Sequence, residues 1–249
     1  MSTLQRFFLT KQPITVSQEI DLAEIHHQLH VVLRLQTGVQ IILLDGQGRA
    51  FQVELSLLTR KGATGQVLAE VSCSAEPITQ VTLYQCTLKA DKFEWILQKG
   101  TELGVSGFVP VISQRSIVRP AAAVLKKYER WQAIIREAAE QCGRSRLPEL
   151  LPPLDWSAAI HHAQGIRLLP WEEENTTALT IKTALTPPNP HDNPKSLALL
   201  IGPEGGLAHE EAVAAQARGW QIVSLGPRIL RAETAALTSI VLAMEYCNP

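Results

Sequence analysis

Short apolar runs separated by turn residues fill the first part of the chain. Residues 39–44 are apolar and residues 50–55 alternate apolar with polar side chains, with Asp45-Gly46 between the two runs. Asp-Gly in that place is a strong signal for a hairpin. A second alternating run at 66–71 follows the turn residues Lys61-Gly62. The pattern predicts three strands joined by tight turns.

One segment of this first region has a helical pattern. Residues 19–30 carry apolar side chains at helical spacing, and Ser17 precedes them as a residue that can begin a helix. Residues 1–75 are therefore predicted to form a small β-rich domain, a partly closed barrel with one helix.

From Ile78 onward the rhythm changes to strand, helix, strand, helix. Short runs rich in apolar and β-branched residues predict strands, of which the unbroken apolar run at 197–201 predicts a buried one, and longer runs with apolar side chains on one face predict helices. Predicted strands lie at 81–88, 107–112, 166–169, 197–201 and 221–225, and predicted helices lie at 92–103, 122–141, 210–218 and 232–246. The proline-rich residues 187–194 are predicted to be a surface loop. This alternation is typical of a mostly parallel sheet, so the predicted class is α/β over residues 76–249, preceded by the β-rich domain.

Charge is spread unevenly along a chain whose formal net charge is only −1. Residues 76–150 carry 11 basic and 8 acidic side chains, whereas residues 151–249 carry 6 basic and 10 acidic ones. The small net charge excludes a protein that binds nucleic acid over its whole surface. A polyanion, if one is bound, is expected on the basic middle segment, although a solvated helix face explains Lys126, Lys127 and Arg130 equally well.

Membrane, disulfide and metal signals are weak throughout. No apolar run approaches the about 20 residues of a membrane span, and residues 1–6 lack the apolar stretch of a signal peptide. The four cysteines are scattered, which is typical of reduced thiols in a cytoplasmic protein. His26 and His30 have the spacing of a helical metal pair, but no third ligand accompanies them. We expect a cytoplasmic protein with no membrane association and no metal.

The first segment with chemical content is LLIGPEGGL at 199–207. A buried strand ends at Ile201, and a turn with three glycines leads into a helix near His209. Such a turn lets main-chain N–H groups approach a small ligand at the carboxyl end of a parallel strand. The segment is neither a Walker loop nor G-x-G-x-x-G, and a turn that binds nothing stays an alternative.

The second segment is SLGPRILRAETAAL at 224–237. Another strand ends at Gly226-Pro227, and a helix begins near Arg231. The helix dipole favours the Glu233 carboxylate in the first turn. Capping explains Glu233, but it does not explain two glycine-proline turns at the ends of two strands that we expect to be neighbours.

Together, the two segments resemble the knot region of the RsmE family within the SPOUT methyltransferases. KGTELGV at 99–105 and EAAEQCGRSRLPE at 137–149 resemble further blocks of that family. QRFF at 5–8 and VLRL at 32–35 resemble its N-terminal signatures, so the resemblance covers nearly the whole chain. One departure is Gln28, where the family tends to carry histidine.

The resemblance implies a PUA-like β-barrel followed by an α/β domain with a trefoil knot, working as a homodimer. Family members methylate N3 of a uridine in 16S ribosomal RNA and use S-adenosylmethionine as cofactor. The small ribosomal subunit RNA is therefore the implied partner. Cofactor contacts are implied at Leu200, Ile201, Gly202, Pro203, Glu204, Gly205, Gly206, Leu225, Gly226, Ile229, Leu230 and Arg231. Trp171-Glu172 is expected as a third contact.

The expected chemistry needs positioning, a proton acceptor and a group that stabilises the anionic uracil ring. Arginine suits the last task, because its planar fork donates to oxygen. The catalytic candidates are Arg144 and Arg231, joined by Glu140 and Glu204 as proton acceptors, and Arg146 is a further donor. An ion pair of Glu140 with Arg136 or Arg144 on the same helix stays an alternative. The expected RNA contacts are Arg6, Arg34, Arg115, Arg144 and Arg146.

Two other functions stay open at this point. A SPOUT enzyme acting on tRNA or on a ribose 2′-hydroxyl carries similar cofactor loops. A non-catalytic RNA-binding module, with structural glycine turns, is a reading from a different class.

Overall fold

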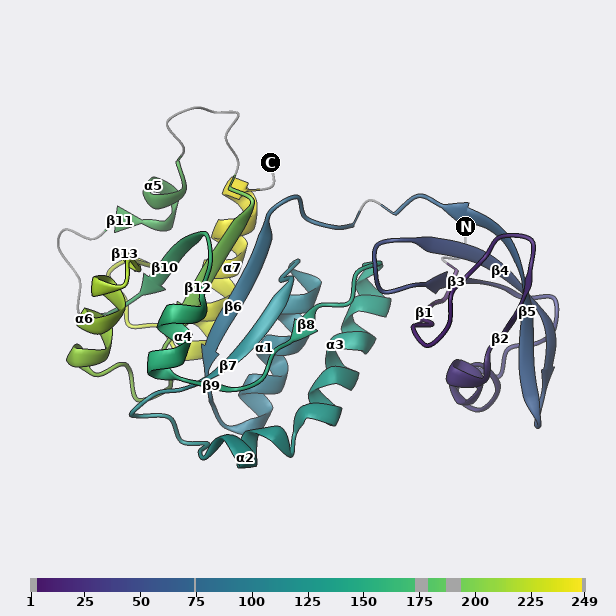
Figure 1. Ribbon diagram of the computed structural model, residues 1–249, viewed down its shortest axis with the longest axis horizontal. Helices are drawn as coiled ribbons and strands as arrows, with labels where there is room; N and C mark the ends of the chain where they lie inside the picture. Colours follow the sequence, from purple (N-terminus) through teal and green to yellow (C-terminus); the bar gives the residue numbers. More distant parts are fainter. Residues whose placement is uncertain (1–3, 74, 173–178, 187–193, 248–249) are drawn as a thin grey trace. The chain divides into compact units, whose positions relative to one another are not determined.

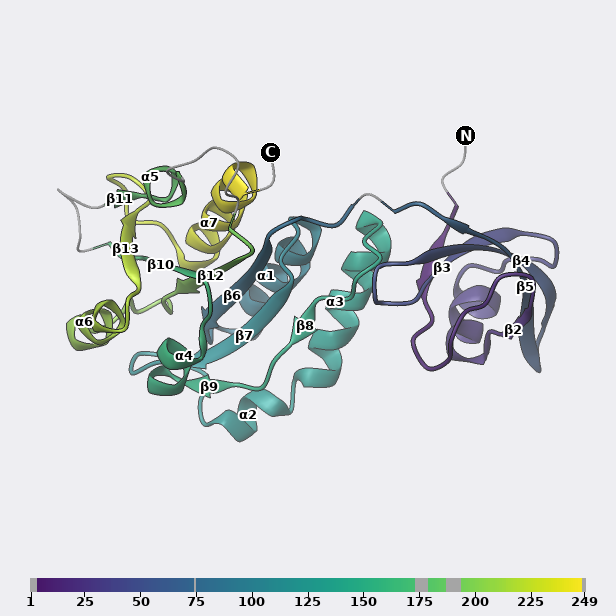
Figure 2. The same ribbon diagram turned by 45° about the horizontal axis from the view of Figure 1, so that its top comes forward.

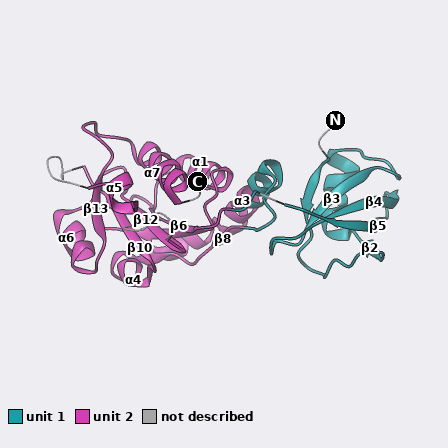
Figure 3. Ribbon diagram, turned by 90° about the horizontal axis from the view of Figure 1, so that it is seen from above, with its two compact units in different colours: residues 1–76, 136–147 teal, residues 77–135, 148–249 magenta. Residues whose placement is uncertain are grey.

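A computed structural model describes residues 4–73, 75–172, 179–186 and 194–247. The chain forms two compact units (Figure 3). The first comprises residues 1–76 and 136–147, and the second comprises residues 77–135 and 148–249. The first break lies beside the predicted point at 75, but residues 136–147 belong with the first unit rather than the second.

The first unit is built on a five-stranded mixed sheet with the order β1-β3-β4-β5-β2 (Figure 1). Its strands are β1 Arg6–Phe8, β2 Glu19–Asp21, β3 Gln40–Leu44, β4 Ala50–Thr59 and β5 Gly62–Val71. The predicted hairpins at Asp45-Gly46 and Lys61-Gly62 join antiparallel pairs and are confirmed. Alternate side chains such as Ile41, Leu43 and Val53 enter one apolar core, as expected for a barrel-like domain.

The predicted helix near residues 19–30 is confirmed over residues 23–30, but residues 19–21 form a strand. Residues Glu19–Asp21 form the edge strand β2, which pairs with β5 and buries only Ile20. Ser17 has φ of 66°, a left-handed conformation that turns the chain instead of beginning a helix. Helical residues then run without a break from 23 to 32: the 3₁₀ turn η1 at Ala23–Ile25, two α-helical residues, and the π-helical turn η2 at Gln28–Val32. Strand pairing therefore overrides the helical spacing only at residues 19–21.

The second unit is an α/β domain, which confirms the predicted class. Its sheet has the order β11-β13-β10-β12-β6-β7-β8, with β9 also beside β7, and every described pairing is parallel. The strands are β6 Gln80–Cys86, β7 Gly107–Ile112, β8 Glu149–Leu150, β9 Leu154–Asp155, β10 Ile166–Pro170, β11 Leu179–Thr180, β12 Ser196–Ile201 and β13 Gln221–Ser224. The strand predictions at 81–88, 107–112, 166–169, 197–201 and 221–225 are confirmed within two residues.

Helices cover both faces of this parallel sheet (Figures 1 and 2). They are α1 Ala90–Glu102, α2 Ala121–Leu125, α3 Tyr128–Cys142, α4 Trp156–His162, α5 Ile181–Leu185, α6 His209–Ala217 and α7 Ala232–Cys247. One apolar core holds α4 and α6 against the sheet, with Trp156, Trp220 and Leu200 among its members. Helix α7 packs against strands β6 and β12 and against helices α1 and α5.

The single helix expected over 122–141 is instead two helices, α2 and α3. The chain turns at Lys126 and Lys127, between the buried residues Val124 and Trp131. Those two buried residues lie seven positions apart, so the apolar spacing is the same with or without the turn. The predicted loop at 187–194 lies outside the described residues except for Pro194. No described helix has the length and apolar character to cross a membrane.

Candidate cofactor and substrate site

Three neighbouring parallel strands of the second unit end at one edge of the sheet. Their order is β13, β10 and β12, so β10 separates the two strands whose turns carry the glycine-proline segments. The sequence-based expectation that these two strands are neighbours is therefore wrong. The middle strand supplies Pro170, and Trp171 and Glu172 follow it. Because all three strands run in parallel, their loops meet at this edge, where ligands bind in open α/β sheets.

Two adjoining pockets lie among these loops. The first lies between residues 170–172 and the loop at 224–230, with about 500 Å³ of space that opens to solvent. The second lies between the loop at 201–207 and residues 229–232, with Lys92 at its wall and about 830 Å³ of space that also opens to solvent. Both pockets share lining residues, namely Pro170, Glu172, Ile229, Leu230 and Ala235. The two glycine loops therefore form one continuous depression.

Most residues expected to contact a cofactor line this depression. Ile201, Gly202, Pro203, Glu204, Gly206, Leu225, Gly226, Ile229, Leu230 and Arg231 do so, together with Trp171 and Glu172. Leu200 is fully buried in the core, and Gly205 is not among the lining residues. The role of each as a cofactor contact stays a prediction.

Glycine is required at the tightest point of the first loop. Gly206 has φ of 69°, and a Cβ atom there would lie 2.6 Å from Oε1 of Glu172. Gly226 in the second loop has φ of 103°, although the space around it is open. Left-handed backbone explains both glycines, whereas the close atom at Gly206 is the end of the flexible Glu172 side chain, which can move.

A charged cluster connects the two loops to helix α1. The Lys92 ammonium lies 3.1 Å from Oε1 of Glu204 in the first loop and 3.7 Å from Oε2 of Glu233 in the first turn of α7. The hydrogen bond with Glu204, more than any other contact, raises the pKa of Lys92. Oε2 of Glu204 has no hydrogen-bond partner among the described residues. Lys92 escaped sequence reasoning, since nothing in its local pattern marks it.

The other two catalytic candidates belong to the first unit. Arg144 is 3% exposed, and its Nη2 lies 3.0 Å from Oε2 of Glu76. The second oxygen of Glu76 accepts hydrogen bonds from the backbone N–H groups of Ser145 and Arg146. Glu76 thus binds the segment 144–146 through both of its oxygens.

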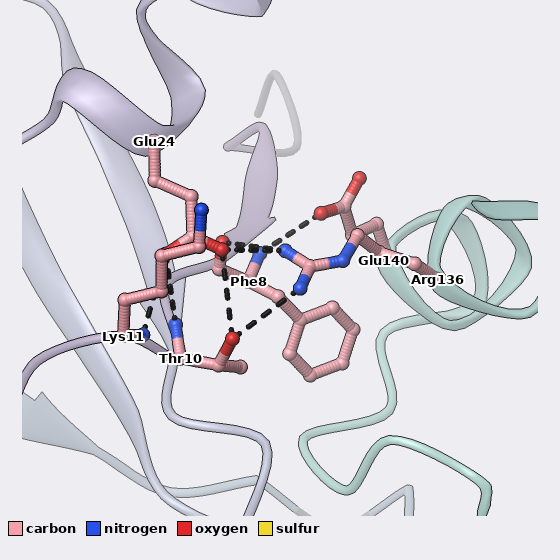
Figure 4. Close-up of polar contacts among 6 residues, drawn as sticks. All are labelled: Phe8, Thr10, Lys11, Glu24, Arg136 and Glu140. Carbon is pink, nitrogen blue, oxygen red and sulfur yellow. Dashed lines mark hydrogen bonds and ion pairs between the residues drawn. The ribbon is translucent and has the colours of Figure 1, made fainter. Parts of the chain in front are cut away.

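Glu140 also contacts the backbone of the first unit. Its Oε1 accepts a hydrogen bond of 2.9 Å from the N–H of Phe8 (Figure 4). Burial raises the pKa of Glu140 above its ordinary value. The suggested ion pair with Arg136 is not what the side chains form, because Arg136 lies 3.1 Å from Glu24 (Figure 4).

The arginines expected to contact RNA are divided between the two units. Arg34 and Arg146 are exposed in the first unit, where Arg146 lies beside Gly48. The Arg6 guanidinium lies against Gly143. Arg115 belongs to the second unit and donates to backbone carbonyls of the first glycine loop. Their RNA contacts stay predictions.

Known proteins match nearly the whole chain in sequence and in structure. The model of the RNA methyltransferase domain matches residues 74–244. Ribosomal RNA small subunit methyltransferase E of Synechocystis is 36% identical over 92% of this chain and 73% of that protein, and the Bacillus subtilis protein of that name is 32% identical over 95% and 94%. The crystal structure of the Neisseria gonorrhoeae protein bound to S-adenosyl methionine superposes with a TM-score of 0.85, at 34% identity over 96% of this chain and 95% of that one.

The chain belongs to the ribosomal RNA small subunit methyltransferase E family. The resemblance seen in the sequence is confirmed. The depression therefore lies in a member of a methyltransferase family, and its chemistry can be tested against the cofactor that the resemblance implies.

The residues of the depression fit a small ligand that carries charges of both signs. Glu172 and Glu204 place carboxylates on the wall, which favours the sulfonium and ammonium charges of S-adenosylmethionine. Lys92 and Arg231 place cations there, which favours the carboxylate of the same molecule. Gly202 and Gly206 let the backbone approach, whereas Ile201, Ile229 and Leu230 offer apolar surface. Ile229 is 86% exposed, as expected of an apolar side chain that a ligand would cover. Among the described residues, no group of three or more His, Cys, Asp or Glu side chains could hold a metal.

Proposed function

We propose that this protein transfers a methyl group from S-adenosylmethionine to N3 of a specific uridine in 16S ribosomal RNA. The observation that carries the proposal is the depression formed by the loops after β10, β12 and β13 in a chain of this family. When bound, the cofactor supplies an electrophilic methyl group. The protein must then hold the uracil nitrogen in line with that methyl group and manage one proton.

Two residues of the second pocket are suited to the uracil. Glu204 has one oxygen facing Lys92 and a second, buried oxygen without a described partner, so we assign it as the acceptor of the N3 proton, which it reaches when the loop adjusts around bound uracil. Arg231 is exposed at the same pocket and can donate to a uracil oxygen as negative charge develops on the ring. The Glu204 carboxylate would take the proton from N3, and the methyl group supplied by the bound cofactor would replace that proton; the S–C bond breaks as the N–C bond forms, which leaves S-adenosylhomocysteine, so atoms and charge balance.

The side chains of Arg144 and Glu140 already form contacts within the first unit, which favours a structural role for both. Arg144 neutralises the Glu76 carboxylate, and Glu140 satisfies the N–H of Phe8. Arg6, Arg34 and Arg146, on the same unit, are our assignments for contacts with RNA phosphates.

The proposal extends to assembly and location. Helices α1 and α7 pack together and leave Trp95 and Val241 about half exposed, which supports a homodimer with apolar side chains at its interface. Light scattering should give twice the mass of the chain. The trefoil knot and the cytoplasmic location are parts of the same proposal. The knot follows from the family resemblance, and the location follows from the scattered cysteines of the sequence.

Cofactor binding and methyl transfer test the proposal against its alternatives. Calorimetry with S-adenosylmethionine should detect binding to the protein alone, and its absence would support the non-catalytic RNA-binding reading. Labelled methyl groups should pass to 16S RNA or small subunits from cells that lack the modification. Transfer to tRNA with none to 16S RNA would favour the other SPOUT reading.

A further inference from the structure

A rigid turn follows strand β7 beside the first glycine loop. Ser113 and Ser116 are each 3% exposed, and their hydroxyl oxygens lie 3.0 Å apart. The backbone N–H of Ser113 donates to Oγ of Ser116, and the N–H of Ser116 donates to the carbonyl of Ser113. Buried, mutually satisfied hydrogen bonds of this kind hold one conformation. We call residues 113–116 the serine turn.

The serine turn holds the first glycine loop at two places. Nη1 of Arg115 donates to the carbonyl oxygens of Gly205 and Leu207, at 3.1 and 3.3 Å. The N–H of Gln114 donates to Oε1 of Glu211 at 2.8 Å, while Oε2 of Glu211 accepts from the N–H of Ala208 at 3.1 Å. Hydrogen bonds from a charged guanidinium are stronger than those between neutral groups. The loop is thus fixed along residues 205–208.

The loop that Arg115 holds also forms the wall of the pocket. Pro203, Glu204, Gly206 and Leu207 line the second pocket, whereas Gly205 does not line it and lies against Arg115. A Cβ at Gly205 would lie 3.4 Å from Cβ of Arg115. The loop therefore lies between the serine turn and the pocket, so a change in Arg115 is transmitted to the wall.

We propose that Arg115 is a positioning residue that sets the affinity of the pocket for its cofactor, and that it is not primarily an RNA contact. This inference rests on the proposed cofactor of the enzyme. A loop that is already ordered loses less conformational entropy on binding, so holding it tightens binding without any contact to the ligand. Arg115 acts through the carbonyls of Gly205 and Leu207.

Arg115→Ala tests the inference in the full-length protein. The dissociation constant for S-adenosylmethionine, measured by calorimetry without RNA, should rise about tenfold, which corresponds to about 1.4 kcal/mol. KM for the cofactor should rise in parallel. The kcat at saturating cofactor and KM for RNA should change by less than about twofold, since a loop that is merely ordered by ligand leaves the chemistry intact.

Two further variants make the test specific. Arg115→Lys keeps a cationic donor within reach of the carbonyls, so its cofactor affinity should lie between the wild type and Arg115→Ala; it also stands in if the alanine variant does not fold. Lys126→Ala removes the same charge from an exposed position in the basic middle segment and should leave cofactor affinity unchanged. Thermal unfolding of each variant shows whether the fold is retained.

The opposite pattern would overturn the inference. Unchanged cofactor affinity in Arg115→Ala, with a higher KM for RNA and a weaker salt dependence, would make Arg115 an RNA contact. If the wild-type protein itself binds no S-adenosylmethionine, the proposed function fails first, and that failure is visible before any variant is made.

Discussion

The proposed methyl transfer depends most on the chemistry of Glu204. It lies in the first glycine loop, lines the second pocket and is held by Lys92 through only one of its oxygens. A carboxylate can accept the N3 proton, whereas an amide of the same shape cannot. Glu204 therefore differs from the other acidic candidate, Glu140. Glu204 lines the pocket, whereas Oε1 of Glu140 accepts a hydrogen bond from the backbone N–H of Phe8.

Glu204→Gln should lower kcat by about 10²- to 10⁴-fold, the usual contribution of a general base. The dissociation constant for the cofactor should rise by a smaller factor, since the amide keeps the size of the side chain and Glu172 still supplies one carboxylate to the wall. Single-turnover kinetics with calorimetry separates the two effects. Glu233→Gln is the matched control, because Glu233 contacts the same lysine but does not line the pocket. Wild-type kcat in the Glu204 variant would remove it from the mechanism.

Glu140 gives a prediction about pH. Burial raises its pKa in the folded protein, so the folded state binds this proton more readily than the unfolded state. The free energy of unfolding therefore falls as pH rises from the ordinary value through the raised one. Glu140→Gln keeps an oxygen for the N–H of Phe8 and removes the buried charge. The variant should gain stability relative to the wild type as pH increases across that window.

Urea unfolding between pH 4 and 7 measures this difference. Glu140→Ala is the control for the hydrogen bond, because it leaves the N–H of Phe8 unpaired at a cost of about 1–3 kcal/mol. A Gln variant that loses stability relative to the wild type as pH rises would show that the ionised carboxylate stabilises the fold.

At the scale of elements, the first glycine loop depends on the absence of a side chain at Gly206. In Gly206→Ala, the left-handed φ costs about 1–2 kcal/mol, and the new Cβ meets Glu172 at 2.6 Å. The loop should shift and cofactor affinity should fall about tenfold or more, while the core of the second unit stays intact. Calorimetry measures the loss of cofactor affinity, and thermal unfolding shows whether the core stays intact. Gly62→Ala, in an open hairpin turn, should change neither.

The contacts of Glu76 are a second feature at this scale. They join the segment after β5 to residues 144–146. Arg144→Ala leaves the Glu76 carboxylate without its buried partner, which costs about 3–5 kcal/mol. Stability of the protein in urea should fall by that amount, with cofactor affinity retained wherever the variant is folded. Full stability with lost turnover would instead support the catalytic role that the sequence suggests for Arg144.

Local pattern predicted most elements but not all their limits. Parallel strands such as β7 and β12 are unbroken apolar runs, which few other structures explain. The helix predicted over 19–30 begins only at residue 23, because pairing of β2 with β5 takes up residues 19–21. The two-residue strands β8, β9 and β11 are too short to leave any periodicity.

At the scale of the whole molecule, the sequence separates residues that the fold brings together. Residues 136–147 follow the second unit's elements in the chain, yet Ala139 packs in one cluster with Phe8, Leu44 and Ala50. Such a grouping depends on long-range contacts, which local pattern does not carry. The same limit explains why local pattern does not place Lys92 at the pocket, whereas the catalytic role of Arg144 stays a prediction.

The cofactor loops were recognisable because they are local. Each is a strand end, a glycine-proline turn and a helix start within about ten residues, and all three parts lie where they were expected. The residues that complete the wall, Lys92 and Pro170, come from other strands and helices. A parallel sheet with this strand order assembles them at one edge, which only the fold reveals.

Identification of the methylated nucleoside is the most direct test of methyl transfer to uridine N3 in 16S RNA. RNA from small subunits that lack the modification should be incubated with the protein and S-adenosylmethionine, then digested to nucleosides and analysed by mass spectrometry against standards. The account predicts 3-methyluridine, at one position of 16S RNA, formed by the wild type and strongly reduced in Glu204→Gln. A methyl group on ribose, or on any base other than uracil, would contradict it.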